Sequence, residues 1–290
     1  MTTRRNFTKL SGLTVLGSAV APLTFGQSKD DIGTMLHNTL NQSKPMGVQA
    51  YSVRQALSKD FQGSMKQIAD IGYQFIEGYG LGLDGKLFGM SPVDYKNIVD
   101  DLGMKLISTH TTYFTPKDAG KVIEAAGESG VKYLVIPYLD DALRDDYYQI
   151  AANLNAVGEL FKGSGIKFCY HNHAFEFEKM NGEIPLDILI KETDPELVSF
   201  EADLYWIKRG GYDPLTYLKQ YPGRFSLFHV KDAAKNLKQT TVGAGTLDFE
   251  SLINAKNELG LEYYFVEDER TKDPFGNISK AFDHMMTLDI

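Results

Sequence analysis

The stretch Lys167-Phe-Cys-Tyr-His-Asn-His-Ala-Phe-Glu176 is a short apolar run that ends in two histidines and an acid. It follows Gly163-Ser-Gly165, a turn signal, and therefore predicts a buried strand. His171 and His173 are two residues apart, so an extended chain points both rings to the same face. Two imidazoles at the end of a buried strand are costly unless they bind something, so we expect a ligand site here.

Three later apolar stretches also end in polar residues. These stretches are Val198-Ser-Phe-Glu-Ala-Asp203, Phe225-Ser-Leu-Phe-His229 and Tyr263-Tyr-Phe-Val-Glu267. With His171, they supply the nitrogen and oxygen ligands that divalent metals take, and predict one metal site formed by His171, Asp203, His229 and Glu267. Each residue has an alternative role. Asp203 could cap a helix, His229 could be held by local hydrogen bonds, and Glu267 could pair with Arg270. His173 could replace His171, or Glu77 could complete the coordination sphere.

Apolar strand-like runs recur about every 30 residues along the chain. They begin near Gly47, Gln74, Lys105, Lys132, Lys167, Leu197, Phe225 and Glu262. Amphipathic segments with helical spacing lie between them, for example 61–71, 93–102, 119–128 and 147–161. Eight alternating units predict a closed (β/α)₈ TIM barrel as a single domain over 46–290. An open doubly wound sheet is the alternative, but no Gly-x-Gly-x-x-Gly follows the first strand.

Residues 1–26 resemble a twin-arginine export signal. Thr3-Arg4-Arg5-Asn6-Phe7-Thr8-Lys9 contains the arginine pair, and Leu13-Thr-Val-Leu-Gly-Ser-Ala-Val-Ala21 is apolar and uncharged. The apolar stretch is shorter than the about 20 residues that span a bilayer comfortably. We therefore expect a periplasmic or otherwise exported protein with no membrane contact after signal removal. An ordinary amphipathic helix is the alternative, and 27–45 is expected to be a linker or short lead-in helix.

Composition narrows the function. Of the 290 residues, 43% are hydrophobic, enough for a sizeable core, and the formal net charge is -8. An acidic chain lacks the basic footprint that phosphate backbones require, so nucleic acid is not expected as a partner. The single cysteine, Cys169, cannot form an internal disulfide and is expected to be a small buried residue.

In a TIM barrel the site lies at the C-terminal ends of the strands. Glu77, His110 and His173 are therefore candidate acids or bases, because a carboxylate in a partly dry mouth has a raised pKa and histidine titrates near neutrality. Lys231 shares the face of His229 and could stabilise an oxyanion. The alternatives are a supporting carboxylate for Glu77, a core histidine for His110 and a solvated Lys231. Substrate contacts are expected from Tyr51, Tyr79, Glu176 and Trp206, whose aromatic members could also be simple packing.

These motifs resemble the sugar phosphate isomerase/epimerase-like group of the xylose isomerase-like TIM barrel superfamily. The resemblance runs from Gly47 to Arg270 and is carried by Phe75-Ile-Glu-Gly-Tyr79, Tyr170-His-Asn-His-Ala-Phe-Glu176, Asp203-Leu-Tyr-Trp206, His229-Val-Lys-Asp232, Val242-Gly-Ala-Gly245 and Val266-Glu-Asp268. It implies one divalent metal held by glutamate, aspartate, histidine and glutamate from strands five to eight. Asp203, His229 and Glu267 match the last three ligands, and His171 stands where the first glutamate is expected.

The resemblance also implies an enzymatic activity of the kind that family members have. They are sugar isomerases, epimerases, dehydratases and, among exported members, 3-keto-glycoside lyases. We expect an isomerase or epimerase that abstracts an α-proton from a non-phosphorylated sugar or keto-sugar through a metal-bound enediolate. Mn²⁺ is the favoured ion, with Zn²⁺, Mg²⁺ or Co²⁺ as alternatives. The rival functions are a 3-keto-glycoside lyase or dehydratase acting by β-elimination and a non-catalytic periplasmic sugar-binding barrel. The oligomeric state, a homo-oligomer included, is left open.

Overall fold

The computed structural model describes residues 44–290. The expected export signal and nearly all of the expected linker lie outside the described residues. Within 44–290, no helix is both long enough and apolar enough to cross a membrane.

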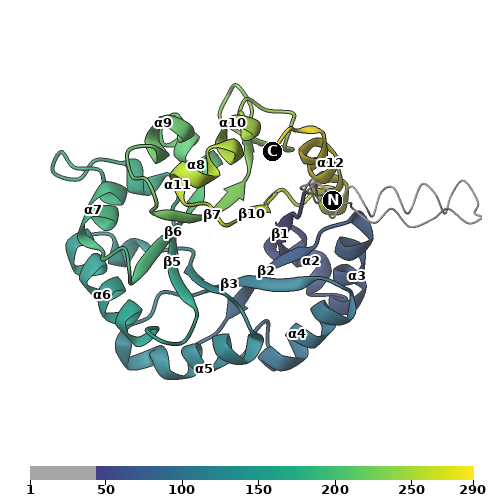
Figure 1. Cartoon of the computed structure of the whole chain (residues 1–290), viewed down its shortest axis with the longest axis horizontal. Helices are drawn as coiled ribbons and strands as arrows, with labels where there is room; N and C mark the ends of the chain where they lie inside the picture. The colour runs from purple at the N-terminus through teal and green to yellow at the C-terminus, as the bar shows by residue number, and fades with distance from the viewer. Residues whose placement is uncertain (1–43) are drawn as a thin grey trace, which may run out of the picture. The chain divides into compact units, whose positions relative to one another are not determined.

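Eight parallel strands close into one barrel, so the predicted (β/α)₈ fold is confirmed (Figure 1). Around the barrel the order is β1-β10-β7-β6-β5-β4-β3-β2, which is the chain order with the last strand closing against the first. The strands are β1 (Gly47–Gln49), β2 (Phe75–Leu81), β3 (Lys105–Thr111), β4 (Tyr133–Ile136), β5 (Lys167–His171), β6 (Val198–Asp203), β7 (Phe225–Val230) and β10 (Tyr263–Val266). The quoted stretch 167–176 thus supplies β5, at the centre of the consecutive strands.

Helices cover the outside of the barrel as a ring (Figure 1). They are α2 (Arg54–Leu57), α3 (Phe61–Ile71), α4 (Pro92–Asp101), α5 (Ala119–Ser129), α6 (Tyr147–Leu160), α7 (Pro185–Glu192), α8 (Leu204–Arg209), α9 (Pro214–Leu218), α10 (Phe249–Asn254), α11 (Lys256–Leu259) and α12 (Pro274–Thr287). Short 3₁₀ turns occupy η1 (Ala50–Val53), η2 (Pro116–Asp118), η3 (Asp141–Leu143) and η4 (Phe175–Phe177). The four amphipathic segments quoted above form α3, α4, α5 and α6. Asp60 and Asp146 cap α3 and α6 with their side chains, and α3 ends at the left-handed Gly72.

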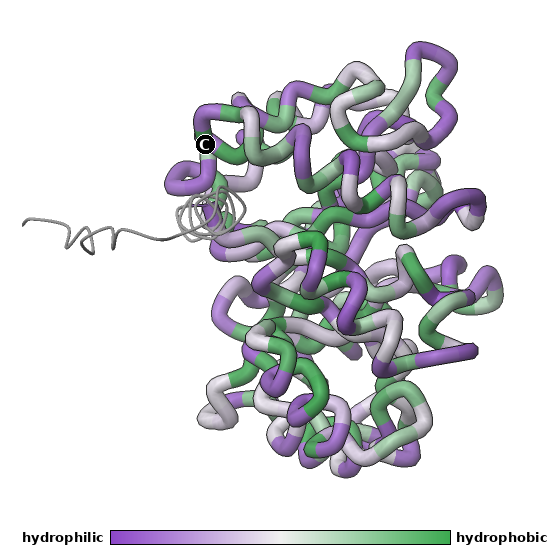
Figure 2. The backbone as a smooth tube through the Cα atoms, turned by 90° about the vertical axis from the view of Figure 1, so that its right-hand side faces the viewer, coloured by the Kyte–Doolittle hydropathy of each residue, from purple (hydrophilic) through white to green (hydrophobic). Residues whose placement is uncertain are grey.

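Two apolar layers hold the fold together. The larger one fills the space between the strands and the helices. Each helix buries only the face that packs on the barrel, and apolar and polar residues accordingly alternate along the chain (Figure 2). The smaller one plugs the barrel interior and consists of Ile107, Tyr133, Val135, Cys169, Leu227 and Phe265. Cys169 is fully buried, as the sequence predicted. Polar side chains on the same strands, beyond this plug, form the candidate site.

A two-stranded hairpin follows β7 and is formed by β8 (Asp232–Ala233) and β9 (Gln239–Thr240). The buried Asp232 carboxylate accepts backbone N–H groups from Ala233, Gly243, Gly245, Thr246 and Leu247 at 2.8 to 3.2 Å. A Cβ at Gly245 would lie 2.1 Å from Asp232 Oδ1, so this position requires glycine. The Val242-Gly-Ala-Gly245 motif therefore builds the loop beside the site.

Candidate active site

Three predicted ligands converge at the ends of β6, β7 and β10. Nδ1 of His229 lies 2.8 Å from Glu267 Oε2 and 3.8 Å from Asp203 Oδ2. The register places Asp203 directly opposite His229 on the neighbouring strand. The ligand atoms of the three residues lie within 4.8 Å of one another, and all three side chains are buried. We call Asp203, His229 and Glu267 the ligand cluster.

The alternative roles of two of these residues are resolved by the geometry. Asp203 does cap α8, because its Oδ1 accepts the Trp206 N–H at 2.9 Å, but its Oδ2 remains directed at the cluster. The alternative partner of Glu267, Arg270, instead donates from Nε to Asp268 at 2.9 Å. His171 lies beside the cluster, with Nε2 3.7 Å from Asp203 Oδ2.

Two fully buried glutamates hold the histidines from behind. Glu77 Oε2 lies 2.5 Å from His229 Nε2, and Glu201 Oε2 lies 3.0 Å from His171 Nδ1. A carboxylate on one ring nitrogen fixes the ring and leaves the other nitrogen available as a ligand. Glu201 was not among the residues predicted from the sequence. It lies two residues before Asp203, so both side chains point to the same face of the strand, as those of His171 and His173 were expected to do.

The depth of Glu77 in the barrel and the direction of its pKa shift both differ from what the sequence predicted. It lies inside β2 with no solvent exposure, beneath His229, and does not reach the barrel mouth. Burial raises the pKa of its carboxyl, but His110 and His229 outweigh this effect and hold the pKa well below its usual range. The expected raised pKa is therefore wrong, because the cationic neighbours outweigh the burial. Glu77 supports His229 in this geometry.

His110 bridges the two glutamates. Its Nε2 lies 2.9 Å from Glu201 Oε2 and 3.4 Å from Glu77 Oε2. Burial lowers the pKa of the His110 ring, but Glu77 and Glu201 together raise it to about 9. The ring is therefore protonated at neutral pH. It also borders the pocket described next, where it can donate a proton.

A pocket of about 420 Å³ adjoins the ligand cluster. It is lined by Tyr51, Arg54, Tyr79, Gly80, His110, Thr111, Pro137, Tyr138, His171, His173, Lys231, Glu267 and Glu269. The predicted residues Tyr51, Tyr79, His110, His171, His173, Lys231 and Glu267 thus meet in one cavity. Arg54, at the start of α2, and Tyr138, in the loop after β4, were missed, because strand periodicity gives no signal for residues beyond the strand ends.

Two expected substrate contacts lie outside this lining. Glu176 is fully buried; it accepts the Tyr170 hydroxyl at 2.6 Å and the His173 backbone N–H at 2.8 Å. Burial raises its pKa to about 7. Glu176 therefore positions the backbone of His173 instead of facing a sugar. Trp206 packs with its ring centroid 5.2 Å from that of His173.

The ring of His173 lines the pocket. Its Nδ1 is buried and has no hydrogen-bond partner among residues 44–290. Burial and the positive charge of Lys231 lower the pKa of its ring to about 3, so the imidazole is neutral. Phe175 stacks on the ring at 5.6 Å with an interplanar angle of 9°. His173 is therefore a fixed, neutral base candidate.

Lys231 is almost fully buried and lies between acids. Its Nζ is 2.9 Å from Asp203 Oδ2, 2.6 Å from Glu267 Oε2 and 2.7 Å from Glu269 Oε1. Burial lowers the pKa of the ammonium group, but the three carboxylates outweigh it and raise the pKa well above its usual range. The solvated-lysine alternative is therefore wrong.

The ligand cluster fits a divalent cation. Asp203 Oδ2 and His229 Nδ1 are buried and lack a hydrogen bond of regular geometry within the described chain, although charged neighbours lie close. With Glu267 Oε2 they make a donor set of one nitrogen and two oxygens, which suits first-row divalent metals, whereas His171 falls in a second group of close ligand atoms with His110, Glu201 and His229. The pKa of His229 is held high by Glu201, Glu267 and Glu77 against the effect of burial, so a bound ion must replace its proton.

Comparisons with known proteins agree with this picture. A sugar phosphate isomerase/epimerase from Parabacteroides distasonis ATCC 8503 is similar in structure, with a TM-score of 0.74 and 29% identity over 84% of this chain and 93% of that one. A xylose isomerase-like TIM barrel protein from Mycobacterium smegmatis, solved in complex with magnesium, shares the fold at 14% identity and a TM-score of 0.63, over 85% of this chain and 96% of that one.

Sequence comparison points the same way. Inosose dehydratase from Lacticaseibacillus casei is 27% identical over 159 residues, which are 47% of this chain and 53% of the relative. The chain thus spans about half the length of this curated relative. The profile described as xylose isomerase-like TIM barrel matches residues 65–288. The chain belongs to the xylose isomerase-like TIM barrel family.

Proposed function

We propose that this chain is a metal-dependent enzyme that removes the proton next to the carbonyl group of a sugar or cyclic polyol ketone, and that loss of water follows. The observation that carries this proposal is the neutral ring of His173, which lines the same pocket as Glu267 of the ligand cluster. Asp203, His229, Glu267 and His171 would hold the ion. When bound, it would polarise the carbonyl and acidify the adjacent C–H.

His173 takes the proton in this scheme. Burial and Lys231 lower the pKa of the ring to about 3, which keeps the imidazole in the neutral form, the form that can accept a proton. Glu176 holds the backbone of His173, and Phe175 stacks on the ring, so the ring has a fixed position. Holding the base in place raises its effective concentration at the substrate C–H.

The other charged groups suit dehydration better than epimerisation. Epimerisation needs a base on each face of the substrate carbon, but Asp203 and Glu267 would be engaged as ligands and His110 is protonated. In dehydration, the C–H bond breaks, its electron pair forms a C=C bond, and the neighbouring C–O bond breaks. His110 gives its proton to the departing hydroxyl, which leaves as water. The name of the Lacticaseibacillus casei relative supports this choice.

Isomerisation is the second candidate, because one base can also return the proton to the neighbouring carbon on the same face. The name of the Parabacteroides distasonis structure favours it. The two reactions differ in mass, since isomerisation keeps every oxygen and dehydration loses one water.

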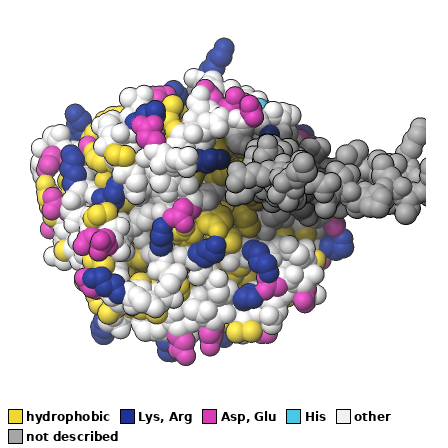
Figure 3. All heavy atoms as spheres, viewed as in Figure 1, with side chains coloured by type: hydrophobic (Ala, Val, Ile, Leu, Met, Phe, Trp, Pro, Cys, Tyr) yellow, Lys and Arg dark blue, Asp and Glu magenta, His cyan; other side chains and the backbone are white. Residues whose placement is uncertain are grey.

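The pocket favours a substrate without phosphate. Both terminal nitrogens of Arg54 already donate hydrogen bonds to backbone carbonyls. One goes to the carbonyl of Tyr51 at 3.0 Å and the other to that of Glu269 at 2.8 Å. Lys231 is paired with Glu269, a carboxylate of the pocket wall, at 2.7 Å. The face of the molecule drawn in Figure 3 carries interspersed acidic and basic side chains and no basic field of the kind that a nucleic-acid backbone requires. Tyr51 and Tyr138 are 39% and 45% exposed and offer flat faces for a sugar ring.

Deuterium exchange tests the proposal. The protein is loaded with Zn²⁺ or Mn²⁺ and incubated in D₂O with inosose, free ketoses and 3-keto-glycosides, and products are followed by NMR and mass spectrometry. We expect deuterium at the α-carbon or a product lighter by one water, and neither from His173→Gln, which should still bind metal. Full activity of His173→Gln would refute the role of His173. Absence of exchange and product on all three substrate classes would refute the reaction.

We also propose that the twin-arginine motif exports the protein to the periplasm. Arg4 and Arg5, followed by the uncharged apolar stretch, support this proposal. Cell fractionation of the double variant Arg4→Lys/Arg5→Lys tests it, with retention of the variant in the cytoplasm as the expected result.

A further inference from the structure

Lys231 lies where it competes with the ion. Its Nζ contacts Asp203 Oδ2 at 2.9 Å and Glu267 Oε2 at 2.6 Å, and these are the same two oxygens that would ligate a metal. An ammonium group and a divalent cation cannot both lie within contact distance of two carboxylate oxygens without strong like-charge repulsion. Occupation of the cluster by the ion therefore requires Lys231 to give up these two contacts.

One of the three carboxylates around Lys231 lies outside the ligand cluster and can retain the ammonium group. Glu269 Oε1 lies 2.7 Å from Lys231 Nζ and belongs to the pocket wall, with 34% of its side chain exposed. The backbone of Glu269 is fixed by Arg54, which donates to its carbonyl at 2.8 Å. The Trp206 ring centroid lies 5.6 Å from Nζ and offers a further favourable face for a cation.

We propose that Lys231 is an internal counter-cation that holds the metal-free ligand cluster together and moves onto Glu269 when a divalent ion binds. The movement turns the ammonium group from the ligands toward the substrate pocket. Lys231 therefore weakens metal binding, since the ion must displace it, and Glu269 offsets part of that cost. This inference rests on the proposed metal site.

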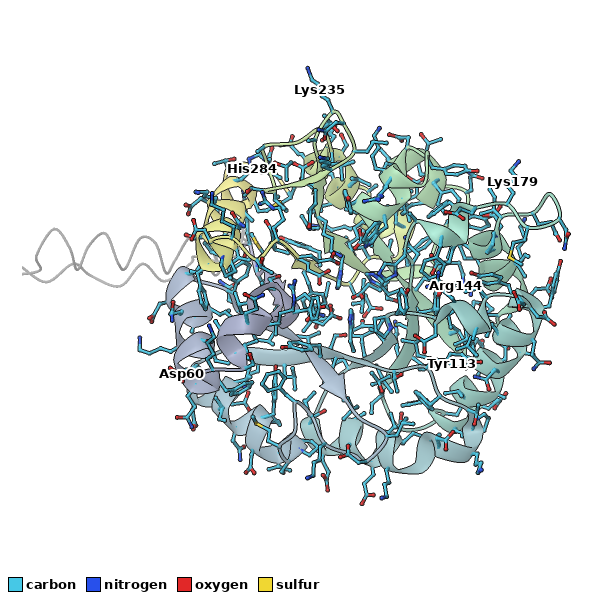
Figure 4. The ribbon with its side chains drawn as sticks, turned by 180° about the vertical axis from the view of Figure 1, so that it is seen from behind. Asp60, Tyr113, Arg144, Lys179, Lys235 and His284 are labelled. Carbon is cyan, nitrogen blue, oxygen red and sulfur yellow. The ribbon has the colours of Figure 1, made fainter. Side chains whose placement is uncertain are left out.

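Zn²⁺ titration of the full chain by calorimetry tests the competition. Lys231→Met removes the charge and keeps the length of the side chain. We expect it to bind Zn²⁺ about tenfold or more tightly than wild type, because no cation has to leave the ligands. Lys235→Met is the matched control, because Lys235 is exposed at a loop tip (Figure 4) and loses the same charge. Its Zn²⁺ affinity should stay within about twofold of wild type.

A double-mutant cycle separates displacement from bulk charge. Glu269→Gln should weaken Zn²⁺ binding about threefold or more in the wild type but change it by less than about twofold in Lys231→Met, because Glu269 acts through Lys231. Equal effects of Glu269→Gln in both backgrounds would overturn its role.

Thermal melting gives a second readout. Metal-free Lys231→Met should melt below wild type, because Asp203 and Glu267 are left without a cation, and Zn²⁺ should raise its melting temperature more than that of wild type. If Lys231→Met does not fold even with Zn²⁺, Glu269→Gln decides alone, and unchanged or tighter binding by this variant overturns the inference. Zn²⁺ binding of equal or lower affinity in a folded Lys231→Met also overturns it. No Zn²⁺ binding by any variant or by wild type would instead remove the metal site itself.

Discussion

Replacement of Glu77 tests whether this residue positions His229. The Glu77 carboxylate forms hydrogen bonds with three buried side chains. Its partners are Gln49 Nε2 at 3.0 Å, Ser108 Oγ at 2.6 Å and His229 Nε2 at 2.5 Å. Glu77→Ala leaves Gln49 Nε2 and Ser108 Oγ without this acceptor, leaves His229 Nε2 with Glu201 Oε2 alone at 3.2 Å, and opens a cavity. Each unpaired buried group costs about 1 to 3 kcal/mol, so we expect the metal-free protein to lose about 3 to 6 kcal/mol of unfolding free energy.

Glu77→Gln separates charge from size. The amide keeps the volume and one acceptor oxygen but cannot balance a protonated His229. We expect a loss of about 1.5 to 3 kcal/mol, in the range for hydrogen bonds to charged groups. Loss of a carboxylate behind a ligand histidine typically lowers metal affinity about 10- to 100-fold, and we expect that range for Zn²⁺ here.

Urea unfolding of the metal-free protein and Zn²⁺ calorimetry measure the two effects. Glu196→Gln is the matched control, because Glu196 is exposed at the start of the chain segment leading to β6. Unfolding free energy of Glu77→Ala within about 1 kcal/mol of wild type, or Zn²⁺ affinity unchanged in a folded Glu77→Gln, would refute the reasoning.

Two further predictions follow from buried acids. Burial raises the pKa of Glu176 from 4.5 to about 7, so the folded state favours the neutral acid. Glu176 therefore contributes fully to the free energy of unfolding below pH 4.5. About 3 kcal/mol of that free energy is lost as the pH rises to about 7. Unfolding free energies measured at several pH values should therefore fall less in Glu176→Gln than in wild type over this window, and parallel curves would contradict the assignment. Asp232→Ala should cost about 3 kcal/mol or more, since its backbone donors lose their acceptor, and hydrogen exchange at 243–247 should accelerate. Unchanged exchange there would show that Asp232 does not hold the loop.

Strand periodicity predicted more of the site than any single motif. Alternation along β5 to β10 brings His171, Asp203, His229 and Glu267 to one end of the barrel, and the register of β6 against β7 pairs Asp203 with His229. The same alternation also places Glu201, two residues before Asp203, on this face. Lys231 was placed on the correct face, but its contacts with three acids could not be read from spacing.

Depth within the barrel could not be predicted from the chain. Glu77 was expected at the mouth, yet it lies inside β2 opposite Ser108, because the stagger between strands decides which layer a residue occupies. Arg54 and Glu269 reach the pocket from segments 215 residues apart that meet only when the barrel closes. Closure is a property of the whole chain, and local patterns do not reveal such pairs.

Metal content tests the central claim most directly. Wild type, Asp203→Ala and His229→Ala are purified from the native compartment, and the divalent metal per chain is measured by mass spectrometry alongside circular dichroism to confirm folding. About one ion per chain in wild type, lost in both folded variants, is the predicted result. Wild type that stays free of metal after incubation with Zn²⁺ and Mn²⁺, or variants that keep the ion, would contradict a metal-dependent reaction at Asp203, His229 and Glu267.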